Sequence, residues 1–291
     1  MVKDGGRRRR VRVAMVKALP VEADREANLG ILERLARPLI GKNLDILVTP
    51  ECFLDGYMVK TKKWSRDDLK ANAEPGEKGK YVQALARLAS HLQSYLAAGF
   101  SECLDGQNLR NAVYLFDRRG EVRGKYYKIH VNRFYSRGSN LPVFDCDFGC
   151  VGIVICADRR WPENVRVLRL KGAELVLVPS YGMHHEHNRI WMQTRAYENG
   201  LFLCFTHPLQ SLITGPSGRV EAILESNVED VLLHDIDLSQ IVPRKTRKKN
   251  ISDSHPIQNR YPELYGELVK PWSRIGASGK DRDDGNGCRR P

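Results

Sequence analysis

The sequence predicts an α/β fold in which two β-sheets pack face to face and helices cover their outer surfaces. Three observations lead to this prediction. Apolar, β-branched segments alternate with amphipathic segments of helical periodicity in both halves of the chain. A hairpin-like section separates the two halves. Finally, 291 residues with 42% hydrophobic side chains are enough to bury one core of ordinary size.

Four segments have the apolar spacing of helices that pack on a sheet. In the first of them, Leu32, Leu35 and Leu39 recur every three or four residues. Gly200 follows the last segment and is a typical helix C-cap. The predicted helices are 24–40, 79–92, 164–170 and 188–199.

Ten segments are predicted to be strands because they are short, apolar and rich in β-branched residues. In the first half they are 11–16, 44–49, 95–100, 109–116 and 122–131, the last two pairing around the turn 117–120. In the second half they are 150–157, 175–179, 201–206, 218–224 and 231–236.

The charge of the chain is concentrated outside this pattern. Residues 1–10, 243–249 and 270–291 together carry the whole formal net charge of +12. We therefore expect a basic, disordered tail at 1–10, one domain at 11–242 and a basic extension at 243–291. The extension also holds four large apolar side chains, which we expect a partner surface to bury: Tyr261, Leu264, Tyr265 and Trp272.

This distribution also limits the classes of partner. A nucleic-acid-binding protein usually carries its basic residues on the folded body, so we expect no nucleic-acid partner. No uncharged run approaches the roughly 18 residues of a membrane span, so we expect no membrane partner. The seven cysteines form no short disulfide framework, which indicates a reducing, cytoplasmic location.

Three reactive side chains lie at the ends of predicted strands. Glu51 follows 44–49, Lys128 lies in 122–131, and Cys156 ends the apolar run 150–157. Strand ends that open onto a crevice are where α/β enzymes assemble sites from distant parts of the sequence. The three residues are therefore candidates for one site.

The chemistry of the three residues is complementary. A thiolate is a nucleophile, a carboxylate takes the thiol proton and later returns it, and an ammonium favours the thiolate. The ammonium and the backbone N–H of Ala157 could together stabilise a tetrahedral oxyanion.

At this point the sequence resembles the nitrilase superfamily of carbon–nitrogen hydrolases. The segments PECFLDGY (50–57), GKYYKIH (124–130) and ICADRRWPENVRVL (155–168) are similar to its three signature blocks, in the same order. TRAYENG (194–200) and TGPSGRV (214–220) are similar to two later segments of the family. The match selects Lys128 over Lys125, because Lys128 directly precedes Ile-His.

The resemblance implies a four-layer αββα sandwich, paired into an αββα–αββα homodimer or a higher homo-oligomer. It implies hydrolysis of non-peptide C–N bonds through a Cys156 thioester, with Glu51 and Lys128 as the other catalytic residues and with neither metal nor cofactor. Many members carry a second Glu between the Lys and Cys blocks, but residues 129–155 contain none. This leaves open what positions the substrate and water.

The turn DRRWPE (158–163) resembles that of N-carbamoyl-D-amino-acid amidohydrolases, in which an Arg grips the substrate carboxylate. A guanidinium suits a carboxylate because it can donate two parallel hydrogen bonds. We expect Arg160 first, and Arg159 second, to bind a carboxylate, with His130 and Ala157 also beside the substrate. The predicted substrates are N-carbamoyl amino acids or related ureido compounds and carboxylated amides.

Alternatives to these assignments remain. One is an amidase or nitrilase with a neutral substrate, in which both arginines are structural. Another is a catalytically impaired member that acts through partners bound by its tails. The segment HHEH (184–187) and the pair Cys146 and Cys150 lack further ligands at zinc spacing, so we expect no metal site. Six cysteines are interpreted as core or surface thiols: Cys52, Cys103, Cys146, Cys150, Cys204 and Cys288.

Overall fold

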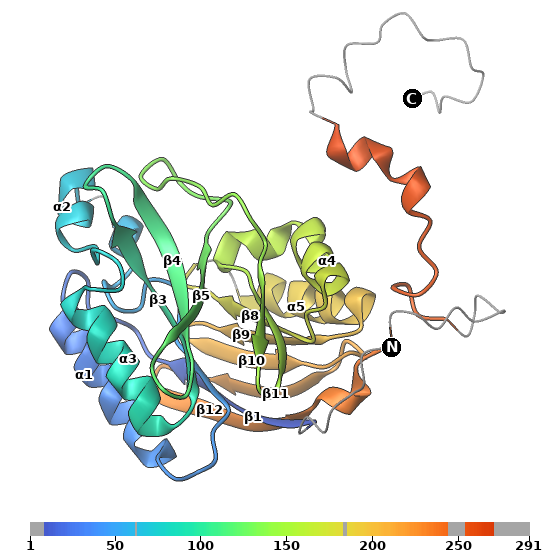
Figure 1. Ribbon diagram of the computed structural model, residues 1–291, viewed down its shortest axis with the longest axis horizontal. Helices are drawn as coiled ribbons and strands as arrows, with labels where there is room; N and C mark the ends of the chain where they lie inside the picture. The colour runs from blue at the N-terminus through green and yellow to red at the C-terminus, as the bar shows by residue number, and fades with distance from the viewer. Residues whose placement is uncertain (1–8, 62, 183–184, 244–253, 271–291) are drawn as a thin grey trace, which may run out of the picture. The chain divides into compact units, whose positions relative to one another are not determined.

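The computed structural model describes residues 9–61, 63–182, 185–243 and 254–270 (Figure 1). The chain divides into two compact units, 1–243 and 244–291. In the second unit, the described part holds two short 3-10 helices, Pro262–Leu264 and Gly266–Val269. The predicted tail 1–8, the basic run 244–249, Trp272 and Cys288 lie outside the described residues. Arg10, placed in the tail by the sequence prediction, is the first residue of β1.

Two six-stranded sheets form the first unit. The first sheet has the order β12-β1-β2-β3-β4-β5, and the second has the order β11-β10-β9-β8-β7-β6. In each sheet three neighbouring strands are parallel, β1-β2-β3 in the first and β7-β8-β9 in the second. The first sheet consists of β1 (Arg10–Lys17), β2 (Ile46–Val48), β3 (Tyr95–Cys103), β4 (Leu109–Phe116), β5 (Val122–Tyr127) and β12 (Asp230–Asp237). The second consists of β6 (Val143–Cys146), β7 (Gly149–Ile153), β8 (Leu175–Pro179), β9 (Phe202–Thr206), β10 (Gln210–Thr214) and β11 (Val220–Glu225).

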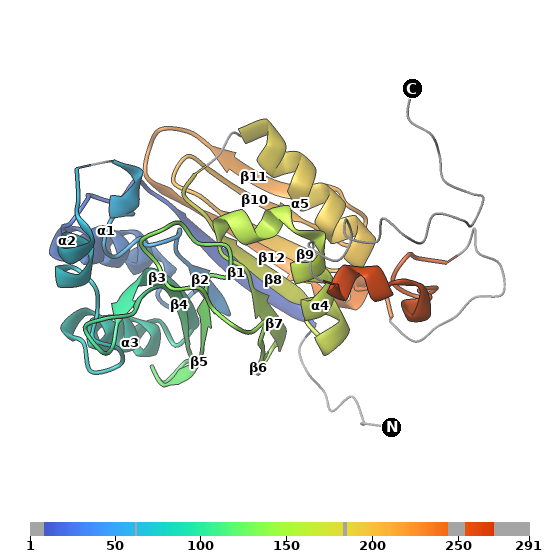
Figure 2. The same cartoon turned by 90° about the horizontal axis from the view of Figure 1, so that it is seen from above.

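Helices cover the outer face of each sheet, as Figure 2 shows from above. The helices α1 (Arg25–Ala36) and α3 (Lys80–Leu92) pack on the first sheet, and Leu32, Leu85 and Leu47 belong to one buried core. The helices α4 (Pro162–Lys171) and α5 (His185–Asn199) cover the second sheet, and Leu168, Met192 and Val176 belong to another. A third core fills the space between the sheets. This arrangement confirms the predicted αββα sandwich.

Several predicted boundaries were wrong, for local physical reasons. The helix predicted at 24–40 ends at Ala36, because Pro38 has no N–H to continue it, and Arg37–Leu39 forms a 3-10 turn. β5 ends at Tyr127 instead of continuing to Val131, and β7 ends at Ile153 instead of continuing to Ala157. The prediction also missed β6, β10 and the short helix α2 (Arg66–Ala71), whose segments are brief and mix polar with apolar residues.

Candidate active site

The structure brings two of the three candidate residues into direct contact. Glu51 lies just beyond β2 and Lys128 just beyond β5, two parallel-running strands of the first sheet. Both side chains are buried, and Lys128 Nζ donates a hydrogen bond to Glu51 Oε1. Asn111 Nδ2 donates a second hydrogen bond to the same oxygen, at 2.8 Å. Glu51 Oε2 is buried and has no hydrogen-bond partner within the described part of the chain, so it can accept a proton.

Cys156 lies close enough to this pair to act on it electrostatically. Burial lowers the pKa of Lys128, but the charges of Glu51 and Cys156 outweigh burial and hold that pKa above its ordinary value. Lys128 therefore remains an ammonium at any physiological pH. The charge of Glu51, followed by burial and by the charge of Cys156, also raises the pKa of the Tyr57 hydroxyl. Tyr57 is thus a neighbour of the site that the sequence analysis did not single out.

The backbone at Cys156 is strained. Cys156 opens a 3-10 turn, Cys156–Arg160, directly after the second sheet's β7, and its φ of +48° lies in the left-handed region. A non-glycine residue held in such a conformation costs about 1–3 kcal/mol and persists only where its surroundings fix it. The Cys156 side chain is buried in the core between the two sheets, and the backbone N–H of Ala157 comes next in the chain.

Asp158 fixes this turn and joins it to the Lys128 segment. Its buried carboxylate accepts hydrogen bonds from Ile155 N at 3.2 Å, on the Cys156 side. It also accepts from His130 N at 2.8 Å and from the Tyr126 hydroxyl at 2.7 Å, on the Lys128 side. Burial alone would raise the pKa of Asp158, but hydrogen bonds from the His130 side chain, the Tyr126 hydroxyl and His130 N outweigh burial and lower that pKa. Asp158 is therefore a charged link between the two sheets.

Glycine at position 99 makes room for Glu51. A Cβ atom at Gly99, on β3, would lie 2.6 Å from Pro50 O and 3.4 Å from Glu51 Cα. The Gly99 N–H also donates to Thr49 Oγ1 at 2.9 Å, which fixes the chain just before Glu51. Any larger residue at 99 would push the carboxylate away from Lys128.

The comparisons with known proteins agree with this geometry. The family model described as "Carbon-nitrogen hydrolase" matches residues 12–246. The chain belongs to the carbon–nitrogen hydrolase family.

Individual relatives differ in their activities. A nitrilase of Pyrococcus abyssi is 30% identical, over 88% of this chain and 99% of that protein. An N-carbamoylputrescine amidase of Arabidopsis thaliana is 26% identical, over 91% of this chain and 97% of that protein. The crystal structure of an amidase from Nesterenkonia sp. matches with a TM-score of 0.74 at 22% identity, covering 89% of this chain and 96% of that one. The family model and the Pyrococcus match make this chain an enzyme of the carbon–nitrogen hydrolase family, and the Nesterenkonia structure shows its fold.

The two arginines after the cysteine have opposite surroundings in this carbon–nitrogen hydrolase. Arg159 is fully buried; its Nε and Nη2 donate to Asn188 Oδ1, and Nη2 also donates to Gly182 O at 3.2 Å. Its guanidinium is thus occupied by the protein, which gives Arg159 a structural place in the turn. Arg160 is exposed, and its guanidinium carbon lies 5.5 Å from the centre of the Trp161 ring. Of the two side chains, only that of Arg160 is exposed to solvent.

His130 forms a flat platform with Trp161. The two rings are stacked, with centroids 3.5 Å apart and planes 4° apart. His130 Nδ1 lies 2.7 Å from Asp158 Oδ1. An ionised carboxylate can only accept, so Nδ1 carries the hydrogen of this contact. The His130 side chain is 27% exposed.

Three other thiols are buried, and burial is the largest cause that raises the pKa of Cys52, Cys146 and Cys204. Cys52 also lies near the charges of Glu51 and Lys128, but their effects do not offset burial. These three thiols are therefore poor nucleophiles. His184 and the side chain of His185 lie outside the described residues. Among the residues that are described, no group of three or more His, Cys, Asp and Glu side chains could hold a metal ion, and no helix is long and apolar enough to cross a membrane.

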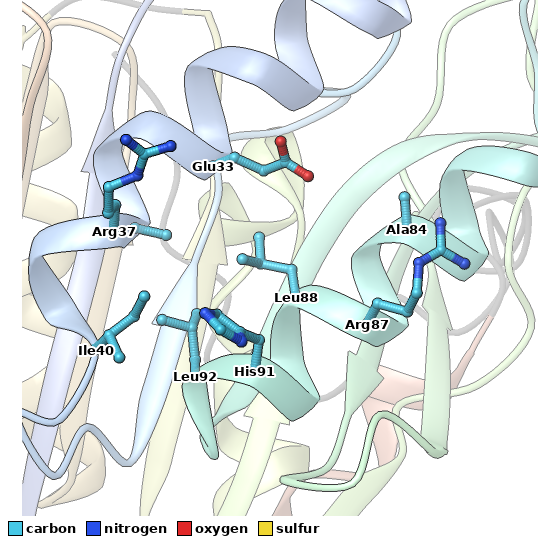
Figure 3. A pocket seen from close by; sticks show the side chains of 9 residues that line it. Glu33, Arg37, Ile40, Ala84, Arg87, Leu88, His91 and Leu92 are labelled. Atoms are coloured by element: carbon cyan, nitrogen blue, oxygen red, sulfur yellow. The ribbon is translucent and has the colours of Figure 1, made fainter.

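A groove of about 440 Å³ lies elsewhere, between α1 and α3 on the outer side of the first sheet (Figure 3). Arg37 and Arg87 stand on opposite helices with Leu88 between them. The nine lining residues are Glu33, Ala36, Arg37, Ile40, Ala84, Arg87, Leu88, His91 and Leu92. None of them comes from the strand ends that carry Glu51, Lys128 and Cys156, so this groove is not the candidate active site.

Proposed function

We propose that this carbon–nitrogen hydrolase cleaves N-carbamoyl amino acids, or related ureido compounds and carboxylated amides, through a thioester on Cys156. The observation that carries the proposal is the arrangement of Glu51. One of its oxygens is held by Lys128 and Asn111, and the other is unpartnered within the described chain. A buried carboxylate with one available oxygen beside a thiol is a general base.

In each half of the proposed reaction, Glu51 takes up one proton and then returns it. Glu51 Oε2 takes the proton of Cys156, and the sulfur attacks the carbonyl carbon. Lys128 Nζ and the Ala157 N–H stabilise the oxyanion that forms. The C–N bond breaks as Glu51 returns the proton to the leaving nitrogen, which leaves a thioester on Cys156. Water then attacks the thioester as Glu51 takes one of its protons, and the proton returns to sulfur when the acid product leaves.

The substrate class rests on Arg160, His130 and Trp161. Arg160 is exposed next to the turn that follows the nucleophile, and it makes no ion pair among the residues described. A guanidinium so placed suits a carboxylate. The Arabidopsis relative is named for an N-carbamoyl compound, which supports the carbamoyl group. The prediction that the substrate carries a carboxylate rests on Arg160 alone.

A neutral amide or nitrile is the second candidate. The burial of Arg159 among protein acceptors favours it, because it shows that one of the two arginines serves the turn. The Pyrococcus relative named nitrilase also favours it.

Mass spectrometry after incubation with a panel of N-carbamoyl amino acids, amides and nitriles separates the candidates. We expect turnover of the N-carbamoyl amino acids and a transient mass increase on Cys156. Cys156→Ala is the matched control and should show neither. Turnover of neutral amides or nitriles only would replace the carboxylated substrate with a neutral one. Turnover of no compound, with no adduct, would favour the impaired member that acts through partners.

We also propose that the chain forms a homodimer or a higher homo-oligomer. Three large apolar side chains are exposed on the outer helices of the second sheet: Leu170 is 40% exposed, and Ile190 and Tyr197 are each 52% exposed. Such side chains gather where a partner covers them. Light scattering at micromolar concentration should give at least twice the 33.1 kDa of one chain, and a monomer would rule out this proposal.

A further inference from the structure

Asn111 contacts both charged residues of the candidate site. It lies on β4, paired with Ser101 of β3, and its side chain is buried. Its Nδ2 donates to Glu51 Oε1 at 2.8 Å. Its backbone oxygen accepts from Lys128 N at 3.0 Å, one residue beyond the end of β5. One residue thus fixes the side chain of Glu51 and the backbone of Lys128.

The orientation of the Asn111 amide is set by Glu51. An ionised carboxylate oxygen only accepts hydrogen bonds, so the amide must turn its NH₂ group toward Oε1. This leaves Asn111 Oδ1 buried and without a hydrogen-bond partner in the described chain. A buried, unpartnered acceptor is unfavourable, and native structures rarely retain one. The hydrogen bond to Glu51 is therefore kept although it leaves Asn111 Oδ1 without a hydrogen bond.

The effect of this contact is on the rotation of the Glu51 carboxylate. The terminal torsion of a glutamate is broad and roughly twofold, so a half-turn exchanges its two oxygens. A single lysine donor on a flexible stem can follow either oxygen. A second donor from the rigid sheet cannot, and it holds Oε1 in place.

We propose that Asn111 is a positioning residue: together with Lys128 it occupies Glu51 Oε1 and so keeps Oε2 as the oxygen that exchanges a proton with Cys156. This inference rests on the proposed catalytic roles of Glu51, Lys128 and Cys156. Asn111 itself is assigned no contact with the substrate.

Two substitutions and one matched control test the inference. Asn111→Asp keeps the size of the side chain but places an acceptor where the donor was, and Asn111→Ala removes the contact. The control is Asn199→Ala on α5. Asn199 is also buried, its Nδ2 donates to Arg195 O at 2.9 Å and to Glu198 Oε1 at 3.4 Å, and its Oδ1 is likewise unpartnered among the described residues. It resembles Asn111 in burial and in donating to a carboxylate, but that carboxylate is not Glu51.

The readouts are kcat and KM against pH on the best compound of the panel, the rate at which iodoacetamide alkylates Cys156, and thermal unfolding. We expect Asn111→Ala to lower kcat by about 10- to 100-fold, the effect of one hydrogen bond to a charged group, with little change in KM. Asn111→Asp should do the same and move the acid limb of the pH profile to higher pH, because two adjacent carboxylates tend to share a proton. Alkylation of Cys156 should slow in both variants. Asn199→Ala should lose only thermal stability.

Three outcomes would overturn the inference. The first is a kcat and a pH profile that equal those of the wild type in both Asn111 variants. The second is a change in KM alone. The third is a loss of activity in Asn199→Ala as large as that in Asn111→Ala. The test is separate from that of the proposed function. If Cys156→Ala retained turnover, the proposed function would fail. If Cys156→Ala were inactive and the Asn111 variants behaved like the wild type, only the role of Asn111 would fail.

Discussion

The two sheets supply the site with different kinds of group and hold them in different ways. The first sheet supplies a charged pair, Glu51 and Lys128, which is held by side-chain hydrogen bonds. The second sheet supplies a thiol, Cys156, which is held by a strained backbone turn. The charges need a partner because each would be costly to bury alone, whereas the thiol needs only to be presented at the right point. We therefore expect substitutions on the two sheets to differ in their effects on stability and on activity.

Asp158 and Gly99 illustrate the same contrast. Asp158 fixes the turn on the second sheet by accepting hydrogen bonds from backbone N–H groups. Gly99 allows the close approach on the first sheet by having no side chain. A strained turn thus fixes the backbone at Cys156, and close packing fixes the backbone at Glu51.

The largest expected effect is on the second sheet. Cys156→Ala should lower turnover by at least about 10⁴-fold, because the nucleophile is gone, while the fold persists. Cys156→Gly should be equally inactive but more stable than Cys156→Ala by about 1 kcal/mol, since glycine tolerates a positive φ. Urea unfolding of both variants measures the difference. Equal stability would show that the turn at Cys156 is not strained.

The next effect is on the first sheet and should appear in stability as well as activity. Lys128→Met leaves Glu51 buried without its ammonium, and breaking a buried pair in this way costs about 3–5 kcal/mol. Adding Glu51→Gln removes the unpaired charge, so the double variant should be more stable than Lys128→Met. Chemical unfolding of the wild type, both single variants and the double variant forms a complete cycle. A double variant less stable than Lys128→Met would contradict the ion-pair interpretation.

The two adjacent arginines of the turn after β7 should respond differently to substitution. Arg160→Ala should lower kcat/KM by about 10- to 100-fold on a carboxylated substrate and much less on its neutral amide, and Arg160→Lys should restore only part. The free energy of unfolding of Arg160→Ala should stay within about 0.5 kcal/mol of that of the wild type. Arg159→Ala should instead lose at least about 2 kcal/mol of stability, because Asn188 then lacks its buried partner, and it should affect both substrates alike. Equal losses on both substrates for Arg160→Ala would favour the neutral substrate.

How much of this could be predicted from the sequence depended on the kind of interaction. Glu51, Lys128 and Cys156 could be selected from the sequence because each lies in or at the end of a predicted strand within a recognisable block. Asn111 could not, because its contact with Glu51 depends on which strands are neighbours in the sheet. The different surroundings of Arg159 and Arg160 could not be predicted either, since two identical residues in one turn are separated only by the three-dimensional path of that turn. The αββα layers followed from periodicity, but β7 ended early because the turn at Cys156 is fixed by Asp158, a tertiary contact.

The smallest expected effect on turnover concerns Asp158, whose hydrogen bonds join the two sides. The pKa of Asp158 is lowered in the folded chain. A carboxyl with a lowered pKa stabilises the fold above its unfolded value of about 3.9, and that contribution is lost as the pH falls through the folded value. Asp158→Asn should therefore cost about 2 kcal/mol at pH 7, and the difference from the wild type should shrink below about pH 4.

The matched control for this variant is Asp105→Asn. Asp105 is exposed, and hydrogen bonds from Gln107 N and Asn108 N likewise lower its pKa, to about 2. It is bonded only to neighbouring residues of its own surface turn, so its substitution should leave turnover unchanged. Asp158→Asn should also slow turnover, because the turn at Cys156 and the segment at Lys128 lose their common acceptor. Thermal unfolding from pH 3 to pH 8 together with kcat measures both effects. A stability difference that persisted undiminished at pH 3, or full activity of Asp158→Asn, would show that the charge of Asp158 does not hold the two sides together.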